Sequence, residues 1–209
     1  SLQEEKNNKI TRRNYLSKVL ANIHLLIAEG LRVKVNCVLM KGINDDEIIP
    51  FIELTKDLNI DMRFIEFMPF DGNKWQMGKM VSLEEVLSVV HSNYNENQIL
   101  RLKDSANDTA KNYSIEGYKG RFAVISSVSE PFCSGCNRIR LTANGSLKNC
   151  LFSSSETSLL QQFRDGKDIT PIIQKEIQSK QKVRSGMDKL SDFADMTSHN
   201  NRSMVAIGG

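Results

Sequence analysis

Three of the four cysteines lie close together in the second half of the chain, at Cys133, Cys136 and Cys150. Two residues separate the first pair, so a tight turn can bring both thiolates to one metal. A hairpin after them would return Cys150 to the same place. Clustered cysteines in a chain that opens without a secretory pattern favour metal binding over disulfide pairing. The spacing therefore predicts a metal centre held by three thiolates.

The number of ligands bears on which metal this would be. Structural zinc sites take four protein ligands, and the three histidines lie far from the cysteines in sequence. Three thiolates suit a [4Fe–4S] cluster that keeps one iron open for a small molecule. Two alternatives stay open at this point: zinc completed by Cys37 or by a partner chain, and buried thiols that bind no metal.

Two arginines follow the second cysteine at a spacing that can serve the same centre. Arg138 and Arg140 are two residues apart, so in an extended strand they share a face with Cys136. Paired guanidinium groups beside an open metal centre could clamp a phosphate. The alternative is an ordinary charged, solvated strand edge.

Other residues are weaker candidates for a functional site. Lys34 interrupts an apolar strand pattern, where burying an ammonium is costly unless it meets an anion, although the side chain could also reach solvent at the strand end. Met68 lies near a strand end and reads from its surroundings as core filler. The terminal Gly208 and Gly209 could thread a narrow site, but a frayed end is the simpler interpretation.

The first part of the chain must position these residues on an α/β framework. Helix and strand patterns alternate there, which is typical of parallel strands joined by right-handed crossovers. The chain opens on a helix, and two parallel strands alone cannot bury both sheet faces. We therefore expect the last portion of a larger sheet or barrel. The patterns predict helices at 14–29 and 48–58 and strands at 32–40 and 61–69.

The remainder has a different character. Capping-box pairs precede two helices of the chain, Asn44 with Glu47 and Ser82 with Glu85. An Asn-Gly pair at 144–145 predicts a hairpin turn within the cysteine segment. The other predictions are an irregular polar stretch at about 92–119, a strand at 120–129, and a helix–turn–helix at 156–180.

Composition bounds the function classes. The 209 residues are 40% hydrophobic and 25% charged, as in an ordinary globular protein. A formal charge of +3 is too small to indicate nucleic-acid binding by itself. The sequence has no apolar run long enough for a transmembrane helix.

Four segments together resemble the family of molybdenum cofactor biosynthesis protein A (MoaA, GTP 3′,8-cyclase), which are radical S-adenosylmethionine enzymes. They are VKVNCVLMKGINDDEI, RFIEFMPFDGNKW, FCSGCNRIRLTANGSLKNCLF and the closing IGG. The resemblance covers essentially the whole chain. It implies the C-terminal part of an incomplete (β/α) TIM-like barrel at 1–78, followed at 79–209 by a small α+β iron–sulfur cluster domain.

The resemblance also implies roles for individual residues. The three cysteines would ligate a [4Fe–4S] cluster whose open iron receives GTP. The segment Arg138, Ile139 and Arg140, together with Lys34, would contact GTP. Met68 and Ser1 match positions that contact S-adenosylmethionine, which overrides the core-filler interpretation of Met68. The di-glycine end, Gly208 and Gly209, would lie near the active site.

The chain departs from the family in one respect. Members cleave S-adenosylmethionine at another [4Fe–4S] cluster, held by a Cys-x3-Cys-x2-Cys motif near the N-terminus, and this sequence has no such motif. We therefore expect a C-terminal portion that is inactive alone. A stand-alone zinc-binding or cluster-binding module without catalysis is the alternative, and an electron-transfer protein is a third class.

The resemblance extends to partners and location. It implies GTP as substrate and a MoaC-type cyclic pyranopterin monophosphate synthase as pathway partner. An exposed sheet edge would favour a homodimer or oligomer. The expected location is cytoplasmic, with the mitochondrial matrix as the alternative for a eukaryotic source.

Overall fold

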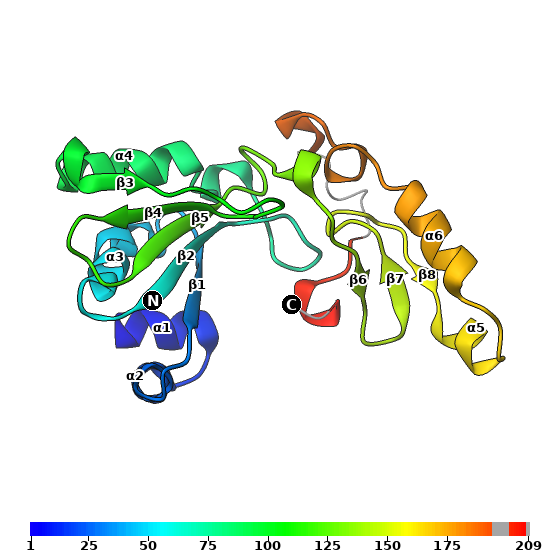
Figure 1. The fold of residues 1–209 in the computed structure, drawn as a ribbon, viewed down its shortest axis with the longest axis horizontal. Coiled ribbons are helices and arrows are strands. Elements are labelled where there is room, and N and C mark those ends of the chain that lie inside the picture. The colour runs from blue at the N-terminus through cyan, green and yellow to red at the C-terminus, as the bar shows by residue number, and fades with distance from the viewer. Residues whose placement is uncertain (194–200, 208–209) are drawn as a thin grey trace. The chain divides into compact units, whose positions relative to one another are not determined.

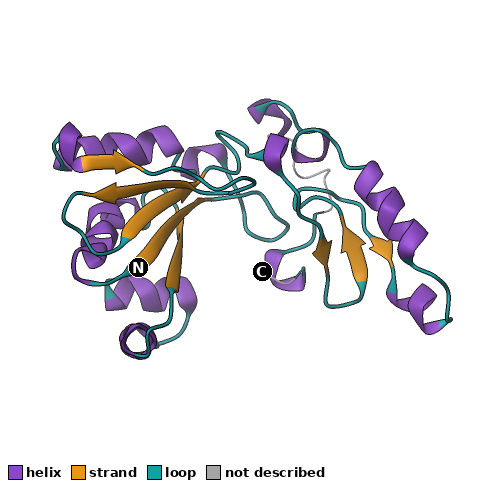
Figure 2. Ribbon diagram, viewed as in Figure 1, coloured by secondary structure: helices purple, strands orange, loops and turns teal. Residues whose placement is uncertain are grey.

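The computed structural model describes residues 1–193 and 201–207, which form a mixed α/β protein (Figures 1 and 2). The chain divides into two compact units. Unit 1 contains Ser1–Phe67 and Gly78–Glu130, and unit 2 contains Met68–Met77 and Pro131–Gly209. The division between these units therefore differs from the predicted boundary at 78/79. The reason is that β5 (Arg121–Ile125) pairs with β2 (Ile60–Glu66) and so belongs to unit 1. As a division between family domains, that boundary stays a prediction.

A five-stranded sheet organises unit 1. β1 (Val33–Leu39), β2 and β5 run parallel, which confirms the two predicted parallel strands. β4 (Lys111–Ile115) pairs antiparallel with β5, and β3 (Ile99–Arg101) pairs antiparallel with β4. The prediction of an irregular stretch over 92–119 is wrong, because these residues complete the sheet. The sheet is mixed, with β1 and β3 at its edges.

Helices α3 (Ile48–Asp57) and α4 (Leu83–Asn93) pack on one face of this sheet and bury its core. Ile52, Phe64, Val86 and Phe122 are fully buried at their interface. Two further helices precede β1, α1 (Glu4–Thr11) and α2 (Leu16–Ala28). α2 confirms the predicted helix, but only Leu16 of it is buried.

The two predicted capping boxes have different outcomes. Ser82 accepts from the Glu85 amide and the Glu85 carboxylate accepts from the Ser82 amide, so this capping box is confirmed. Asn44 makes no cap. Its side chain instead accepts from Met40 N at 2.8 Å and donates to the Val38 carbonyl at 2.9 Å, because it closes the loop after β1.

Unit 2 contains a small antiparallel sheet, β6 (Arg140–Leu141), β7 (Ser146–Lys148) and β8 (Thr157–Ser158), in that order. Gly145 has φ +76° in the turn between β6 and β7, which confirms the predicted hairpin. α5 (Leu160–Arg164) and α6 (Thr170–Gln178) follow and confirm the predicted helix–turn–helix from residue 160 on, whereas its predicted start is wrong because Thr157–Ser158 pairs as β8. Among the residues described, no helix has the length and apolar character needed to cross a membrane.

Candidate metal centre and ligand-binding residues

The three clustered cysteines lie in the same compact unit as free thiols. Cys133 begins a 3-10 turn, Cys133–Gly135, and the Cys136 amide closes that turn by donating to the Cys133 carbonyl at 3.1 Å. Cys150 follows β7 on the returning arm of the hairpin. All three side chains are half-buried. The local fold thus places the Cys-x2-Cys pair on a turn and the third thiol on the returning arm of the hairpin. That the three thiols hold one metal centre stays a prediction.

The pKa values of two of these thiols, Cys150 and Cys136, are shifted in opposite directions. Burial is the main effect that raises the pKa of the Cys150 thiol, and the thiols of Cys133 and Cys136 raise it further. At Cys136 burial alone would raise the pKa, but the Arg138 amide and the Lys180 ammonium outweigh it, so the pKa lies below its usual value. A thiolate is the form that ligates metal. The donor set therefore fits a thiolate-ligated group, although no three His, Cys, Asp or Glu side chains of the described residues are arranged to hold a metal ion as they stand.

The fourth cysteine has a different environment. Cys37 is buried in the core of unit 1, and burial raises the pKa of its thiol to about 11. The Asn44 side chain donates to its sulfur at 3.5 Å. Such a thiol stays protonated at neutral pH, which is typical of a packing residue rather than a ligand.

The arginines after Cys136 do not lie on one continuous strand. The backbone is extended at Cys136, and β6 begins at Arg140. That the two arginines share a face with Cys136 stays a prediction. The Arg138 guanidinium lies 4.8 Å from the centre of the Phe132 ring, and Arg140 donates from Nη1 to the Ile207 carbonyl at 3.2 Å. Arg138 and the intervening Ile139 are exposed. Each guanidinium group is thus held by a different contact.

Lys34 lies on the face of the sheet opposite the helices. In register, it pairs with Asp61 of β2, which pairs with Arg121 of β5. The next residues on this face are Asn36 and Arg63. Lys34 is exposed, so the ammonium bears no burial cost in this structure. The face is polar where the opposite face forms the core.

Arg63 is a candidate that sequence reasoning missed. The side chain is half-buried, and its Nε is a buried atom with no hydrogen-bond partner among the described residues. Buried donors without partners are rare in folded proteins and require an explanation. The signal in the sequence was the alternation of Asp61 and Arg63 on one face of a strand that otherwise reads as apolar.

The remaining predicted residues are placed as follows. Ser1 donates from its hydroxyl to Glu47 at 2.7 Å, which anchors the start of the chain in unit 1. Met68 begins the segment 68–77 of unit 2, is half-buried, and accepts at its carbonyl from the Asn73 side chain at 2.7 Å. Gly208 and Gly209 lie outside the described residues.

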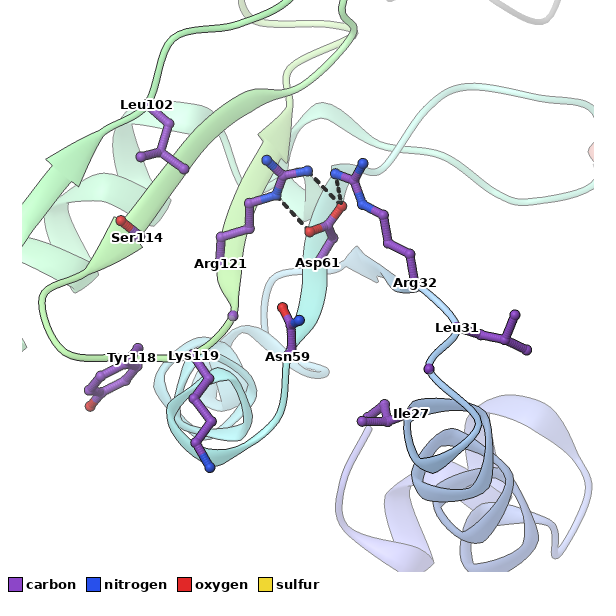
Figure 3. A pocket seen from close by; sticks show the side chains of 12 residues that line it. Ile27, Leu31, Arg32, Asn59, Asp61, Leu102, Ser114, Tyr118, Lys119 and Arg121 are labelled. Atoms are coloured by element: carbon purple, nitrogen blue, oxygen red, sulfur yellow. Dashed lines mark hydrogen bonds and ion pairs between the residues drawn. The ribbon is translucent and has the colours of Figure 1, made fainter.

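A separate cavity of about 600 Å³ opens in unit 1 at the amino ends of the parallel strands. Figure 3 shows Arg32 and Arg121 directed at Asp61 on its wall. Arg121 donates to both carboxylate oxygens, at 2.6 and 2.8 Å, and Arg32 donates to one at 2.9 Å. Both guanidinium groups thus have an acceptor within the protein. We therefore assign this ion-paired cluster to the stability of the sheet.

The fold and the cysteine segment define a class of protein: a mixed α/β chain whose second unit carries three free cysteines close together in sequence. Residues 60–185 match the family model described as Molybdenum Cofactor Synthesis C. The chain belongs to this family. The sequence resemblance is thereby confirmed.

Curated relatives agree with this assignment. The chain is 44% identical to a protein of Arabidopsis thaliana named GTP 3′,8-cyclase, mitochondrial, over 96% of this chain and 50% of that protein. It is 42% identical to human molybdenum cofactor biosynthesis protein 1, over 95% of this chain and 30% of that protein. A GTP 3′,8-cyclase of Alkaliphilus oremlandii is 39% identical over all of this chain and 62% of its own length. The chain thus spans about half the length of the plant relative.

Proposed function

We propose that this chain supplies the GTP-binding part of a GTP 3′,8-cyclase of molybdenum cofactor biosynthesis, a radical S-adenosylmethionine lyase that converts GTP to (8S)-3′,8-cyclo-7,8-dihydroguanosine 5′-triphosphate. The observation that carries the proposal is the set of three free thiols in one compact unit, with two arginines directly after the second of them. Family membership and the names of the relatives support the reaction.

Cys133, Cys136 and Cys150 would hold a [4Fe–4S] cluster. Such a cluster with three protein ligands offers one iron to a substrate atom, and its reactivity belongs to the cofactor. The protein's contribution is to present three thiolates on a short turn and a hairpin, with N–H donors close to two of the sulfurs.

Cationic residues would bind the polar groups of GTP. Arg138 and Arg140 offer planar guanidinium groups, which suit phosphate and base oxygen atoms. Lys34 and Arg63 offer two more cations on the polar sheet face. Holding the ribose and base of one nucleotide in a fixed geometry is the orientation effect that an intramolecular cyclisation requires.

The radical-generating half of the reaction belongs to a part of the enzyme with the Cys-x3-Cys-x2-Cys motif. Met68 and Ser1 are proposed to contact S-adenosylmethionine. We infer that the chain alone does not turn over GTP, and that the product of the complete enzyme passes to a MoaC-type synthase. Homodimer formation through the β1 edge stays a prediction.

Anaerobic reconstitution with iron and sulfide, followed by electron paramagnetic resonance of the reduced protein with and without GTP, tests the proposal. We expect a [4Fe–4S] signal that shifts when GTP is added and is lost in Cys133→Ala. Cys37→Ala is the matched control and should keep the signal, because that thiol is a core residue. Bound zinc in place of iron, or a cluster signal that GTP leaves unchanged, would favour a module without catalysis.

A further inference from the structure

Two hydrogen bonds reach the cysteine sulfurs from the segment that follows α6. The Lys180 ammonium donates to Cys136 Sγ at 3.2 Å. It also donates to the carbonyls of Cys136, at 3.3 Å, and Arg138, at 2.7 Å. A single cation therefore binds both a predicted ligand sulfur and the backbone that leads to the arginines.

The second bond comes from a turn with unusual backbone geometry. The Arg184 amide donates to Cys133 Sγ at 3.4 Å. Arg184, Ser185 and Gly186 have φ values of +38°, +59° and +93°. Positive φ is disfavoured for residues other than glycine, and such strain is found preferentially at functional sites.

The turn is fixed by the side chain of Arg184, which is buried. Its guanidinium donates to the carbonyls of Met187, at 2.9 Å, and Asp188, at 2.7 Å, and lies 5.0 Å from the centre of the Phe193 ring. These contacts hold the backbone amide in the direction of Cys133. Main-chain N–H groups in such turns form the anion-binding concavities found at many iron–sulfur sites.

We propose that Lys180 and the turn 184–186 form an outer hydrogen-bonding layer that retains the cluster on Cys133 and Cys136 and raises its reduction potential. The inference rests on the proposed function, since it requires the cluster. Reduction adds negative charge to a cluster, and N–H···S bonds and a nearby cation stabilise the reduced form. Lys180 is thus a positioning residue: it acts on the cluster through the Cys136 sulfur.

The experiment measures the reduction potential of the reconstituted chain by anaerobic redox titration with electron paramagnetic resonance. Lys180→Met should lower the ratio of reduced to oxidised cluster at a fixed potential at least tenfold, which is 59 mV for a one-electron couple. Lys180→Arg keeps the charge and should recover most of that loss. Lys175→Met removes an exposed lysine from α6 and is the matched control, expected at the wild-type potential.

A second pair of variants tests the turn independently and covers the case in which Lys180→Met does not fold. Ser185→Val cannot easily hold a φ of +59°, whereas Ser185→Gly can. We expect Ser185→Val to lose iron to a chelator at least tenfold faster than wild type, and Ser185→Gly to match wild type.

The outcomes separate this inference from the proposed function. If wild-type chain takes up no iron–sulfur cluster, the proposed function fails and this inference fails with it. If wild type is loaded but Lys180→Met and Lys175→Met have the same potential, and Ser185→Val retains iron as wild type does, only the hydrogen-bonding layer is refuted.

Discussion

Replacing Arg63 by methionine should weaken GTP binding and leave the fold at least as stable. The prediction follows from the buried Nε of this side chain, which has no hydrogen-bond partner among the described residues. A buried donor without a partner costs about 1–3 kcal/mol. In the absence of ligand, Arg63 is therefore a source of instability, and a phosphate or base oxygen would supply the missing acceptor.

The substitution should raise the free energy of unfolding and weaken the binding of GTP. Methionine fills a similar volume without polar atoms, so the free energy of unfolding should rise by about 1 kcal/mol, which is roughly 2–4 °C in Tm for a chain of this size. A hydrogen bond to a charged group contributes about 1.5–3 kcal/mol. Losing it should raise the Kd for GTP roughly 10- to 150-fold.

Urea unfolding and isothermal titration with GTP on the same reconstituted preparation measure both quantities. Arg13→Met, which changes an exposed arginine at the end of the α1 segment, is the control and should change neither. A variant that loses more than about 1 kcal/mol of stability and binds GTP as wild type does would refute the reasoning. It would place Arg63 among the residues that stabilise the sheet.

Two predictions concern groups of unit 1 that the fold itself uses. Glu66→Gln should lower the free energy of unfolding by about 2–4 kcal/mol. The reason is that the buried Glu66 carboxylate accepts from the amides of Val128, at 2.7 Å, and Ser129, at 2.9 Å. Urea unfolding measures this change, and a loss below about 0.5 kcal/mol would contradict the prediction. The hydrogen-bonded Arg101 guanidinium lowers the pKa of Asp104 to about 2, so this pair stabilises the fold above the ordinary pKa of an aspartate and loses that effect as pH falls toward 2. Asp104→Asn should therefore lower the free energy of unfolding at neutral pH by about 1 kcal/mol, after allowance for partial exposure. It should also make that free energy depend less on pH between about pH 4 and pH 2. Urea unfolding over this pH range measures both, and an unchanged pH dependence would contradict the prediction.

The elements predicted correctly from sequence are those that local patterns determine. The alternation in β1, the Ser82 capping box and the Asn-Gly turn at 144–145 each depend on a few neighbouring residues. β3 and β4 were missed for the opposite reason. They are three and five residues long, and they become strands by pairing with β5 and with each other, which no local pattern records.

The candidate site likewise contains residues that the sequence indicated and residues that it did not. Cys133 and Cys136 are neighbours in sequence, so their spacing alone indicated a ligand pair. Lys180 donates to Cys136 across 44 positions, and Arg184 donates to Cys133 across 51. Residues that reach a site from so far along the chain have no signature in spacing, and only the folded structure brings them to the sulfurs.

Arg121 and Arg63, on one face of the sheet, differ in whether the protein itself supplies their hydrogen-bond acceptors. Arg121 donates to both oxygens of Asp61, at 2.6 and 2.8 Å, so its charge is matched within the protein. Arg63, on the adjoining strand, buries an Nε donor with no acceptor among the described residues. If both arginines served only the fold, Arg63 would lower the free energy of unfolding with no compensating contact, because an apolar side chain of similar size would pack there at a lower free-energy cost. An anionic or carbonyl-bearing ligand would give that donor a partner, and this is the physical reason for the proposal that Arg63 contacts the substrate.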